Sequence, residues 1–206
     1  MTALKELAQR NPEWRPWLAE VGALLAELDN ADWDKAVPLL EPVEGGSAVP
    51  LVARAGIRPQ EAPIPLLHAC RRQWSGALPK AWSRGYCPVC GGWPALAEMC
   101  GVERARYLRC VRCGAAWRMH GLACPYCANA DHAELGSLVP QDGPPKWSIE
   151  VCRRCRGYLK VLMALRPAAP GALLLEDLRT VELDLAARQR GYRRPEGEGY
   201  AADDAA

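Results

Sequence analysis

Four pairs of cysteines constrain this chain more than any other feature of its sequence. Eight of the ten cysteines lie in Cys-x-x-Cys spacing, as Cys87/Cys90, Cys110/Cys113, Cys124/Cys127 and Cys152/Cys155. Chance would give about half of one such pair in a chain of this length and composition. Where thiols are kept reduced, cysteines in this pattern indicate metal ligands rather than disulfides.

The gaps between the pairs predict how they combine. A tetrahedral thiolate site needs four sulfurs about 2.3 Å from the metal, and one Cys-x-x-Cys turn supplies two of them. Nineteen residues separate the first pair from the second, and twenty-four separate the third from the fourth. The first gap fits zinc-ribbon spacing and the second slightly exceeds it. We therefore expect two neighbouring sites in chain order, with an interleaved arrangement as the alternative: Cys87, Cys90, Cys110 and Cys113 in one, and Cys124, Cys127, Cys152 and Cys155 in the other. Four thiolates suit iron and zinc alike.

The residue after each second cysteine bears on the shape of the turn. A left-handed backbone at this position closes the turn, and glycine adopts it without steric cost. Gly91 and Gly114 follow the first two pairs, whereas Ala128 and Arg156 follow the last two. We expect the last two pairs to form a slightly different turn.

The other cysteines and the histidines fit structural roles. Cys70 lies on the apolar face of an expected helix, and Cys100 directly precedes a turn glycine. His68, His120 and His132 are isolated from the cysteine pairs, so we do not expect them to be ligands. No serine–histidine–aspartate set, phosphate-binding glycine loop or carboxylate pair stands out, and we do not expect an enzyme.

Composition narrows the class of protein further. The chain has 26 basic and 24 acidic residues, and 50% of it is hydrophobic, which favours a folded chain over a strongly polycationic nucleic-acid binder. No apolar run approaches the ~20 residues of a membrane span, and the amphipathic start lacks a secretory signal. We expect a cytoplasmic protein without membrane insertion.

The expected fold class is α+β. It comprises an N-terminal helical domain, two adjacent rubredoxin- or zinc-ribbon-like metal modules of short antiparallel strands, and a C-terminal helix. Apolar periodicity predicts helices at 11–28, 32–40, 65–74 and 172–189. Segments that favour β structure predict strands at 107–110, 115–119, 135–139, 147–151 and 158–163. The predicted boundaries are 1–84 for the helical domain, 85–122 for the first module, 123–194 for the second module with the C-terminal helix, and 195–206 for a flexible tail.

Arginines surround the cysteine pairs. They could form a solvated face that balances thiolate charge, a surface for an acidic protein partner, or a nucleic-acid surface, which the near-zero net charge makes the weakest interpretation. Glu103, Glu134 and Glu150 are expected to be solvated. The arginines in question are Arg104, Arg106, Arg109, Arg112, Arg118, Arg153, Arg154 and Arg156.

Several motifs follow one another in a distinctive order. CPVCG at 87–91 precedes RYLRCVRC at 106–113, CPYC at 124–127, CRRCRGYLK at 152–160 and EDLRTVELD at 176–184. This order resembles the formate dehydrogenase accessory (formation) protein family, FdhE, over residues 87–192. The resemblance implies iron held by the eight paired cysteines. It also makes a further set of residues candidates for a shared surface or a contact between helix and ribbon, namely Tyr158, Lys160, Asp177, Thr180 and Asp184.

The expected function follows from the paired cysteines and from the family resemblance. The resemblance implies a cytoplasmic accessory protein needed for the assembly of active formate dehydrogenase, with the catalytic subunit of that enzyme as its partner. We expect the metals, iron or zinc, to make rigid the surface that receives this subunit. A nucleic-acid-binding zinc-ribbon protein and a rubredoxin-type electron carrier are the alternatives; a nucleic-acid partner is disfavoured, and self-association stays open.

Overall fold

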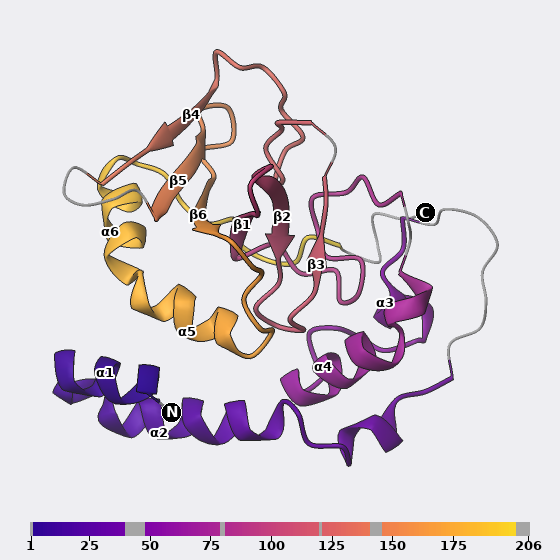
Figure 1. The fold of residues 1–206 in the computed structure, drawn as a ribbon. Helices are drawn as coiled ribbons and strands as arrows, with labels where there is room; N and C mark the ends of the chain where they lie inside the picture. The colour runs from indigo at the N-terminus through magenta and orange to yellow at the C-terminus, as the bar shows by residue number, and fades with distance from the viewer. Residues whose placement is uncertain (1, 40–47, 79–80, 120, 141–145, 201–206) are drawn as a thin grey trace.

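The N-terminal part of the chain is helical. The computed structural model describes residues 2–39, 48–78, 81–119, 121–140 and 146–200. Two short 3-10 turns, η1 (Pro12–Trp14) and η2 (Trp33–Ala36), lie between its N-terminal helices, and a third, η3 (Ser75–Ala77), follows the last of them. The helices themselves are α1 (Thr2–Arg10), α2 (Arg15–Glu27), α3 (Leu51–Arg54) and α4 (Ile64–Gln73). Figure 1 shows α1 and α2 side by side, with α3 and α4 at the far end of α2.

The helix expected over 32–40 is wrong in its extent. Only the 3-10 turn η2 forms there, and Val37 has extended backbone with φ −73° and ψ 121°. Pro38 follows Val37, and its ring disfavours helical backbone in the residue before it. The helical stretch therefore stops at Ala36, and Leu40 lies outside the described residues.

Six strands form one mixed sheet in the order β3-β2-β1-β6-β5-β4. The pairs β1–β2, β2–β3, β4–β5 and β5–β6 are antiparallel, whereas β1 and β6 are parallel, with Leu96 opposite Lys160 and Cys100 opposite Ala164. The α+β class is confirmed, and the parallel pair joins its two antiparallel halves into one sheet. The strands are β1 (Leu96–Cys100), β2 (Ala105–Arg109), β3 (Ala116–Trp117), β4 (Leu135–Leu138), β5 (Trp147–Cys152) and β6 (Tyr158–Ala164).

Strand β1 was not predicted from the sequence, although it lies at the centre of the sheet. Its residues are buried on both faces, so the sequence LAEMC lacks the alternation of a half-exposed strand. Glu98 at its middle is fully buried against Arg109 of β2 and accepts a hydrogen bond of 2.8 Å from the backbone N–H of Ala168. A buried ion pair thus occupies a position that a sequence pattern assigns to solvent.

The C-terminal helix predicted over 172–189 is two helices, α5 (Ala172–Arg179) and α6 (Val181–Gln189). They meet at Thr180, whose backbone leaves the helical region at φ −118° and ψ 28°. The Lys160 ammonium bonds the backbone carbonyl oxygen of Asp177 at 2.7 Å and that of Thr180 at 3.4 Å. These carbonyls are directed to the sheet, so the bend is part of the contact between the helices and β6.

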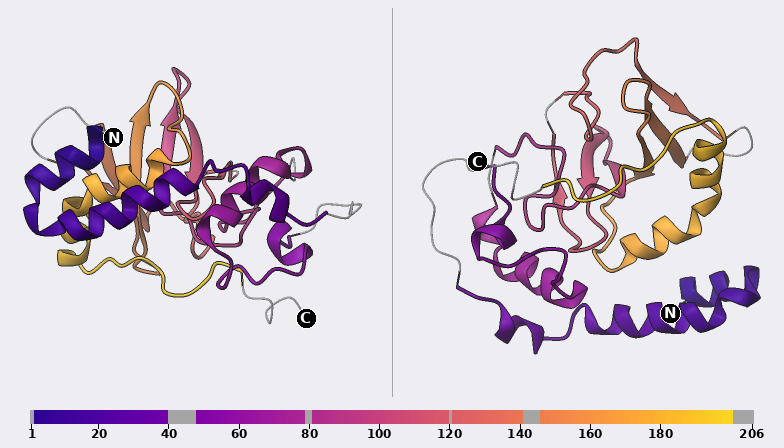
Figure 2. Two further views of the ribbon diagram at one scale, coloured as in Figure 1. Left: turned by 90° about the horizontal axis from the view of Figure 1, so that it is seen from below. Right: turned by 180° about the vertical axis from the view of Figure 1, so that it is seen from behind.

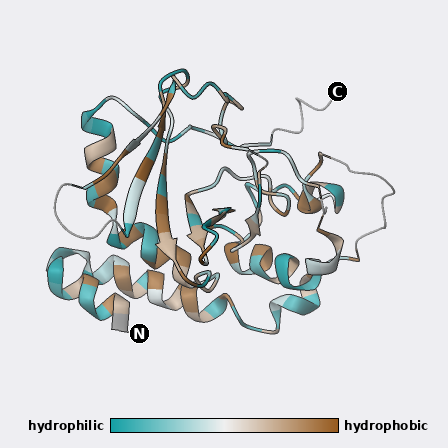
Figure 3. Ribbon diagram, turned by 45° about the horizontal axis from the view of Figure 1, so that its top comes forward, coloured by the Kyte–Doolittle hydropathy of each residue, from teal (hydrophilic) through white to brown (hydrophobic). Residues whose placement is uncertain are grey.

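The N-terminal helices contact the C-terminal helices beside the sheet. Figure 2 shows α2 running past α5 and reaching toward α4. Ion pairs of 2.9 Å from Arg10 to Glu182 and 3.1 Å from Arg179 to Glu6 connect α1 with the C-terminal helices. Figure 3 shows hydrophobic and hydrophilic residues mixed along the strands and along the turns of the helices. No described helix combines the length and the apolar character that crossing a membrane requires.

The larger apolar core lies on the α4 side of the sheet. It contains Leu51 of α3, Leu67 of α4, Leu108 of β2 and Val161 of β6, together with the cysteines at 87, 90, 110 and 113. A smaller cluster of Ile149, Val151, Tyr158 and Ala187 joins β5 and β6 to α6. The first four paired cysteines are therefore part of the main core, and the last four lie outside it.

Candidate metal centres

Four tight turns of one design carry the eight paired cysteines. In each turn the backbone N–H of the first cysteine donates to the carbonyl oxygen five residues later. The acceptors lie 2.9, 3.0, 2.8 and 2.9 Å away and belong to Gly92, Ala115, Asn129 and Gly157, respectively. The turns at 110–113 and 152–155 each connect two antiparallel strands, β2 to β3 and β5 to β6. The same local fold is therefore used at equivalent places in both halves of the sheet.

The turns assemble into two groups in chain order. In each group the four sulfurs lie within 4.8 Å of one another: Cys87, Cys90, Cys110 and Cys113 in the first, and Cys124, Cys127, Cys152 and Cys155 in the second. Sulfurs of the first group approach at 3.5 Å in two pairs, and those of the second at 3.6 and 3.8 Å. The grouping agrees with the expectation from spacing, and the interleaved alternative is wrong.

The distances between sulfurs test whether a metal ion fits. Four sulfurs at 2.3 Å from a tetrahedral ion lie about 3.8 Å apart, whereas a disulfide brings two sulfurs to about 2.05 Å. The observed separations of 3.5 to 3.8 Å match the first arrangement, and all ten cysteines are free thiols. Both groups could therefore hold a zinc or iron ion in an all-sulfur site.

The expectation of a different turn after the third and fourth pairs is wrong. Gly91 and Gly114 have φ of +75° and +74°, and Ala128 and Arg156 take up the same left-handed backbone at +56° and +59°. A residue with a Cβ atom in this region costs about 1–2 kcal/mol. The turn is held by its hydrogen bonds and by the arrangement of the sulfurs, so it persists without the glycine.

Hydrogen bonds from the chain point at the sulfurs. The backbone N–H of Val89 donates to Cys87 Sγ at 3.4 Å, and that of Gly157 donates to Cys155 Sγ at 3.4 Å. The side-chain amide of Asn129 donates to Cys152 Sγ at 3.7 Å. Such donors stabilise thiolate charge. Asn129 was missed in the sequence, and its place directly after the CPYCA segment is the signal that could have identified it.

Burial raises the pKa of four of these thiols and so opposes their ionisation. It raises the pKa of Cys87 and of Cys113 far above the usual value, and hydrogen bonds from the neighbouring thiols lower that of Cys110. In the second group burial raises the pKa of Cys155 to about 11. Against the effect of burial, the backbone N–H groups of Cys155 and Arg154 and the Asn129 amide lower the pKa of Cys152 to about 7. Without a metal, the thiols of each group therefore keep and share protons. A divalent cation would supply the positive charge that keeps four thiolates together.

The surroundings of the first group come from distant parts of the chain. The N–H groups of Leu51 and Val52 in α3 donate to the carbonyls of Pro88 and Val89, both at 2.9 Å. The Tyr200 N–H donates to the Gly91 carbonyl at 2.9 Å. Residues 195–200, expected as part of a flexible tail, therefore include a contact with this turn, and residues 201–206 lie outside the described part.

The isolated histidines and unpaired cysteines are placed as follows. His68 of α4 is 1% exposed, burial lowers its pKa to about 4, and its Nε2 finds no hydrogen-bond partner within the described ranges. His132 is exposed, and His120 lies outside the described residues. Cys70 is fully buried in the main core, as predicted, and Cys100 is buried at the end of β1. None of these described side chains belongs to either group of four sulfurs.

Three of the arginines singled out in the sequence have acidic partners inside the fold. Arg106 forms a bidentate contact with Glu150 at 2.7 and 3.1 Å, and the Glu150 side chain, expected to be solvated, is 31% exposed. Arg109 pairs with buried Glu98, and Arg112 bonds Glu198 at 2.9 Å. The strand arginines are therefore used largely for internal contacts. The exposed members of the set are Arg104, Arg118, Arg153, Arg154 and Arg156.

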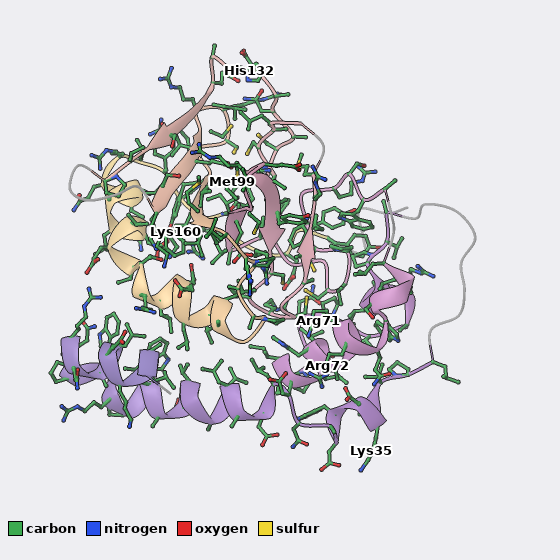
Figure 4. All side chains as sticks on the ribbon, in the orientation of Figure 1. Lys35, Arg71, Arg72, Met99, His132 and Lys160 are labelled. Atoms are coloured by element: carbon green, nitrogen blue, oxygen red, sulfur yellow. The ribbon has the colours of Figure 1, made fainter. Side chains whose placement is uncertain are left out.

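The five residues that the resemblance singled out form one network between helix and sheet. Lys160, labelled in Figure 4, has a fully buried side chain and contacts Asp177 and Asp184 at 2.8 Å each. The Tyr158 hydroxyl donates to Asp184 at 2.7 Å, and the Thr180 hydroxyl donates to the carbonyl of Asp177 at 3.1 Å. Arg194 completes the set with ion pairs of 2.5 Å to Asp177 and 2.9 Å to Asp184. Of the two roles considered, the contact between helix and ribbon is the one that these bonds describe.

Two comparisons with known proteins identify relatives, and no family model matches the chain. The chain is 31% identical over 118 residues to a Protein FdhE homolog of Aquifex aeolicus (strain VF5). This match covers 56% of this chain and 41% of that protein. It is 29% identical over 198 residues to a Protein FdhE homolog of Erwinia tasmaniensis. This second match covers 86% of this chain and 63% of that protein.

A solved structure agrees with the sequence matches. The crystal structure of the FdhE protein from Pseudomonas aeruginosa superposes with a TM-score of 0.50 at 26% sequence identity, covering 96% of this chain and 73% of that one. The chain spans less than half the length of the Aquifex relative and 36% of Protein FdhE of Escherichia coli O127:H6. In sequence and in fold, this chain is therefore similar to FdhE proteins.

Proposed function

We propose that this protein is a non-catalytic cytoplasmic accessory factor for the formation of active formate dehydrogenase. Similarity to FdhE proteins supports the proposal, because the motifs of residues 87–184 resemble those of the formate dehydrogenase accessory proteins. The catalytic subunit of formate dehydrogenase is the proposed partner. The two four-sulfur groups lie on one sheet, which is consistent with a scaffold that presents a fixed surface.

The proposal includes two bound metal ions. Cys87, Cys90, Cys110 and Cys113 would hold one ion, and Cys124, Cys127, Cys152 and Cys155 the other. Bound in this way, zinc would cross-link the chain, and iron would do the same and add one-electron chemistry. Anaerobically purified protein is expected to contain two iron or zinc ions per chain by elemental analysis. Visible thiolate-to-iron absorption identifies iron, and protein without bound metal would refute this part.

The proposed docking surface lies at the second group. Arg153 and Arg154 are exposed on its second turn, next to the exposed Arg156, whose guanidinium stacks 4.5 Å from the Tyr192 ring. These cations, unlike those of the strands, are free of acidic side chains among the contacts described. An acidic surface on the catalytic subunit is the complementary partner, because steering between opposite charges raises the rate and specificity of association.

The experiment combines a deletion strain with charge-reversal variants. Loss of the protein should lower formate dehydrogenase activity while leaving the catalytic subunit detectable by immunoblot. The wild-type chain should restore activity, whereas Arg153→Glu with Arg154→Glu should fail to restore it and fail to capture the subunit. The control is Arg15→Glu with Lys35→Glu, which reverses two exposed charges on the N-terminal elements. Normal activity in the deletion strain would refute the function, and capture by the Arg153/Arg154 variant at wild-type level would refute the surface.

A further inference from the structure

The two groups of sulfurs differ in how far solvent reaches them. Cys87, Cys90, Cys110 and Cys113 are each 0% exposed. In the second group Cys124 and Cys152 are 5% and 2% exposed, and Cys127 and Cys155 are only partly buried. The same local turn therefore gives a closed group in one half of the sheet and an open one in the other.

The closed group owes its cover to segments outside the cysteine-bearing stretch. α3 bonds the first turn through Leu51 and Val52, and Tyr200 bonds the residue that ends that turn. On the second turn a Cβ added to Gly114 would lie 2.4 Å from the Pro170 side chain and 3.0 Å from that of His68, so both residues pack directly on it. An ion inside this group could leave only after several elements had separated.

The open group borders two hollows. One is a cavity of about 340 Å³ lined by Cys124 and Cys152 of the group and by apolar side chains that include Leu122, Met99 and Met163. The other is a cavity of about 250 Å³ lined by Cys155, Tyr126, Arg193 and Glu196. Figure 4 marks two residues that line the larger cavity, Met99 on the sheet and His132 on the loop at the top of the view. A water molecule takes up about 30 Å³ of liquid, so both spaces admit small solutes.

We propose that the second centre is an exchangeable metal site, open to small chelating donors such as thiols, whereas the first centre is a closed structural site. This inference rests on the proposed binding of one ion by each group. In the exchange an incoming thiol gives up its proton and binds the ion as a thiolate, while a departing cysteine thiolate takes up one proton. The number of metal–sulfur bonds and the total charge are unchanged, and neither an oxidant nor a reductant is needed.

Metal release measures the difference directly. Full-length protein loaded with two zinc ions is mixed with an excess of a chromogenic pyridylazo chelator. Release is expected in two phases of one ion each, with rates that differ about tenfold or more, because the closed group depends on local opening of packed structure. With N-ethylmaleimide present, peptide mass spectrometry should find Cys124, Cys127, Cys152 and Cys155 labelled in the fast phase and Cys87, Cys90, Cys110 and Cys113 only in the slow phase.

A cavity-filling variant assigns the path. Ser148 lines the larger cavity, so Ser148→Leu should slow the fast phase and leave the slow phase unchanged. The control is Ser83→Leu, on an exposed serine outside both cavities, which should leave both phases as they are. The order in which the cysteines of the wild-type protein are labelled does not depend on how either variant folds.

The outcomes separate the two proposals. Two bound ions released in one phase, or labelling of the first group before or together with the second, would overturn the exchangeable site while leaving metal binding intact. Protein that binds neither zinc nor iron would overturn metal binding itself and this inference with it. A Ser148→Leu variant with an unchanged fast phase would exclude the larger cavity as the path.

Discussion

Lys160→Met removes a fully buried ammonium from between two carboxylates. The side chain is 0% exposed and bonds Asp177 and Asp184 at 2.8 Å, while Arg194 retains its own contacts with both at 2.5 and 2.9 Å. Removing one partner of a buried ion pair costs about 3–5 kcal/mol. Because Arg194 still compensates both carboxylates, we expect a loss near the lower end, about 3 kcal/mol in the free energy of unfolding.

Guanidinium unfolding of the metal-loaded protein, followed by circular dichroism, measures this loss. Lys146→Met is the matched control, because Lys146 is exposed just before β5 and surface changes of this kind cost less than about 0.5 kcal/mol. Asp184→Asn should lower the free energy of unfolding less in the Lys160→Met variant than in the wild type, because in that variant the Asp184 carboxylate has already lost the Lys160 ammonium. A Lys160→Met variant as stable as the Lys146→Met control would refute the reasoning.

The same network predicts a dependence on pH. Burial would raise the pKa of Asp184, but the hydrogen bond from Lys160 and the charge of Arg194 hold it below the usual value. A carboxyl with a lowered pKa stabilises the fold above its unfolded value near 4, and this stabilisation disappears as the pH falls through the lowered folded value. Lys160→Met removes one cause of the lowering, so acid unfolding should begin at a higher pH than in the wild type. An unchanged acid midpoint would contradict this account.

Three further changes test separate parts of the fold. Cys110→Ser should halve the bound metal, whereas Cys70→Ser should leave it unchanged, as measured by elemental analysis; equal metal content in the two variants would refute the assignment of the first site. Ala128→Gly should stabilise the protein by about 0.5–1 kcal/mol by relieving left-handed strain, whereas Ala130→Gly should not, and thermal unfolding shows which holds. Glu98→Gln leaves buried Arg109 without its anion and should cost about 3–5 kcal/mol in guanidinium unfolding, and a loss below 1 kcal/mol would contradict the importance of that pair.

The cysteine groups could be predicted because their information is local. Each Cys-x-x-Cys turn carries its own hydrogen bonds, and the gaps between turns allow only a few pairings, so spacing alone led to the observed sets. Periodicity likewise located α4 and the C-terminal helical region, although the single expected helix is bent at Thr180.

The rest of the fold depends on contacts between distant residues, which a sequence pattern does not display. Strand β1 is buried on both faces and carries Glu98, so it lacks the alternation that identifies a strand. The bend at Thr180 is set by Lys160, twenty residues earlier in the chain. Arg106 and Glu150 looked like surface charges because their partnership spans three neighbouring strand pairings of the sheet.

The parallel pairing of β1 with β6 has a consequence for how the chain is made. Leu96 and Lys160, which are opposite each other, are 64 positions apart, and the whole second cysteine group is synthesised between them. Contacts over such separations form late in folding, since the intervening loop must close first. During translation the earlier group emerges with the N-terminal helices and only three of the six strands, and the sheet can be completed only after both sulfur clusters have left the ribosome.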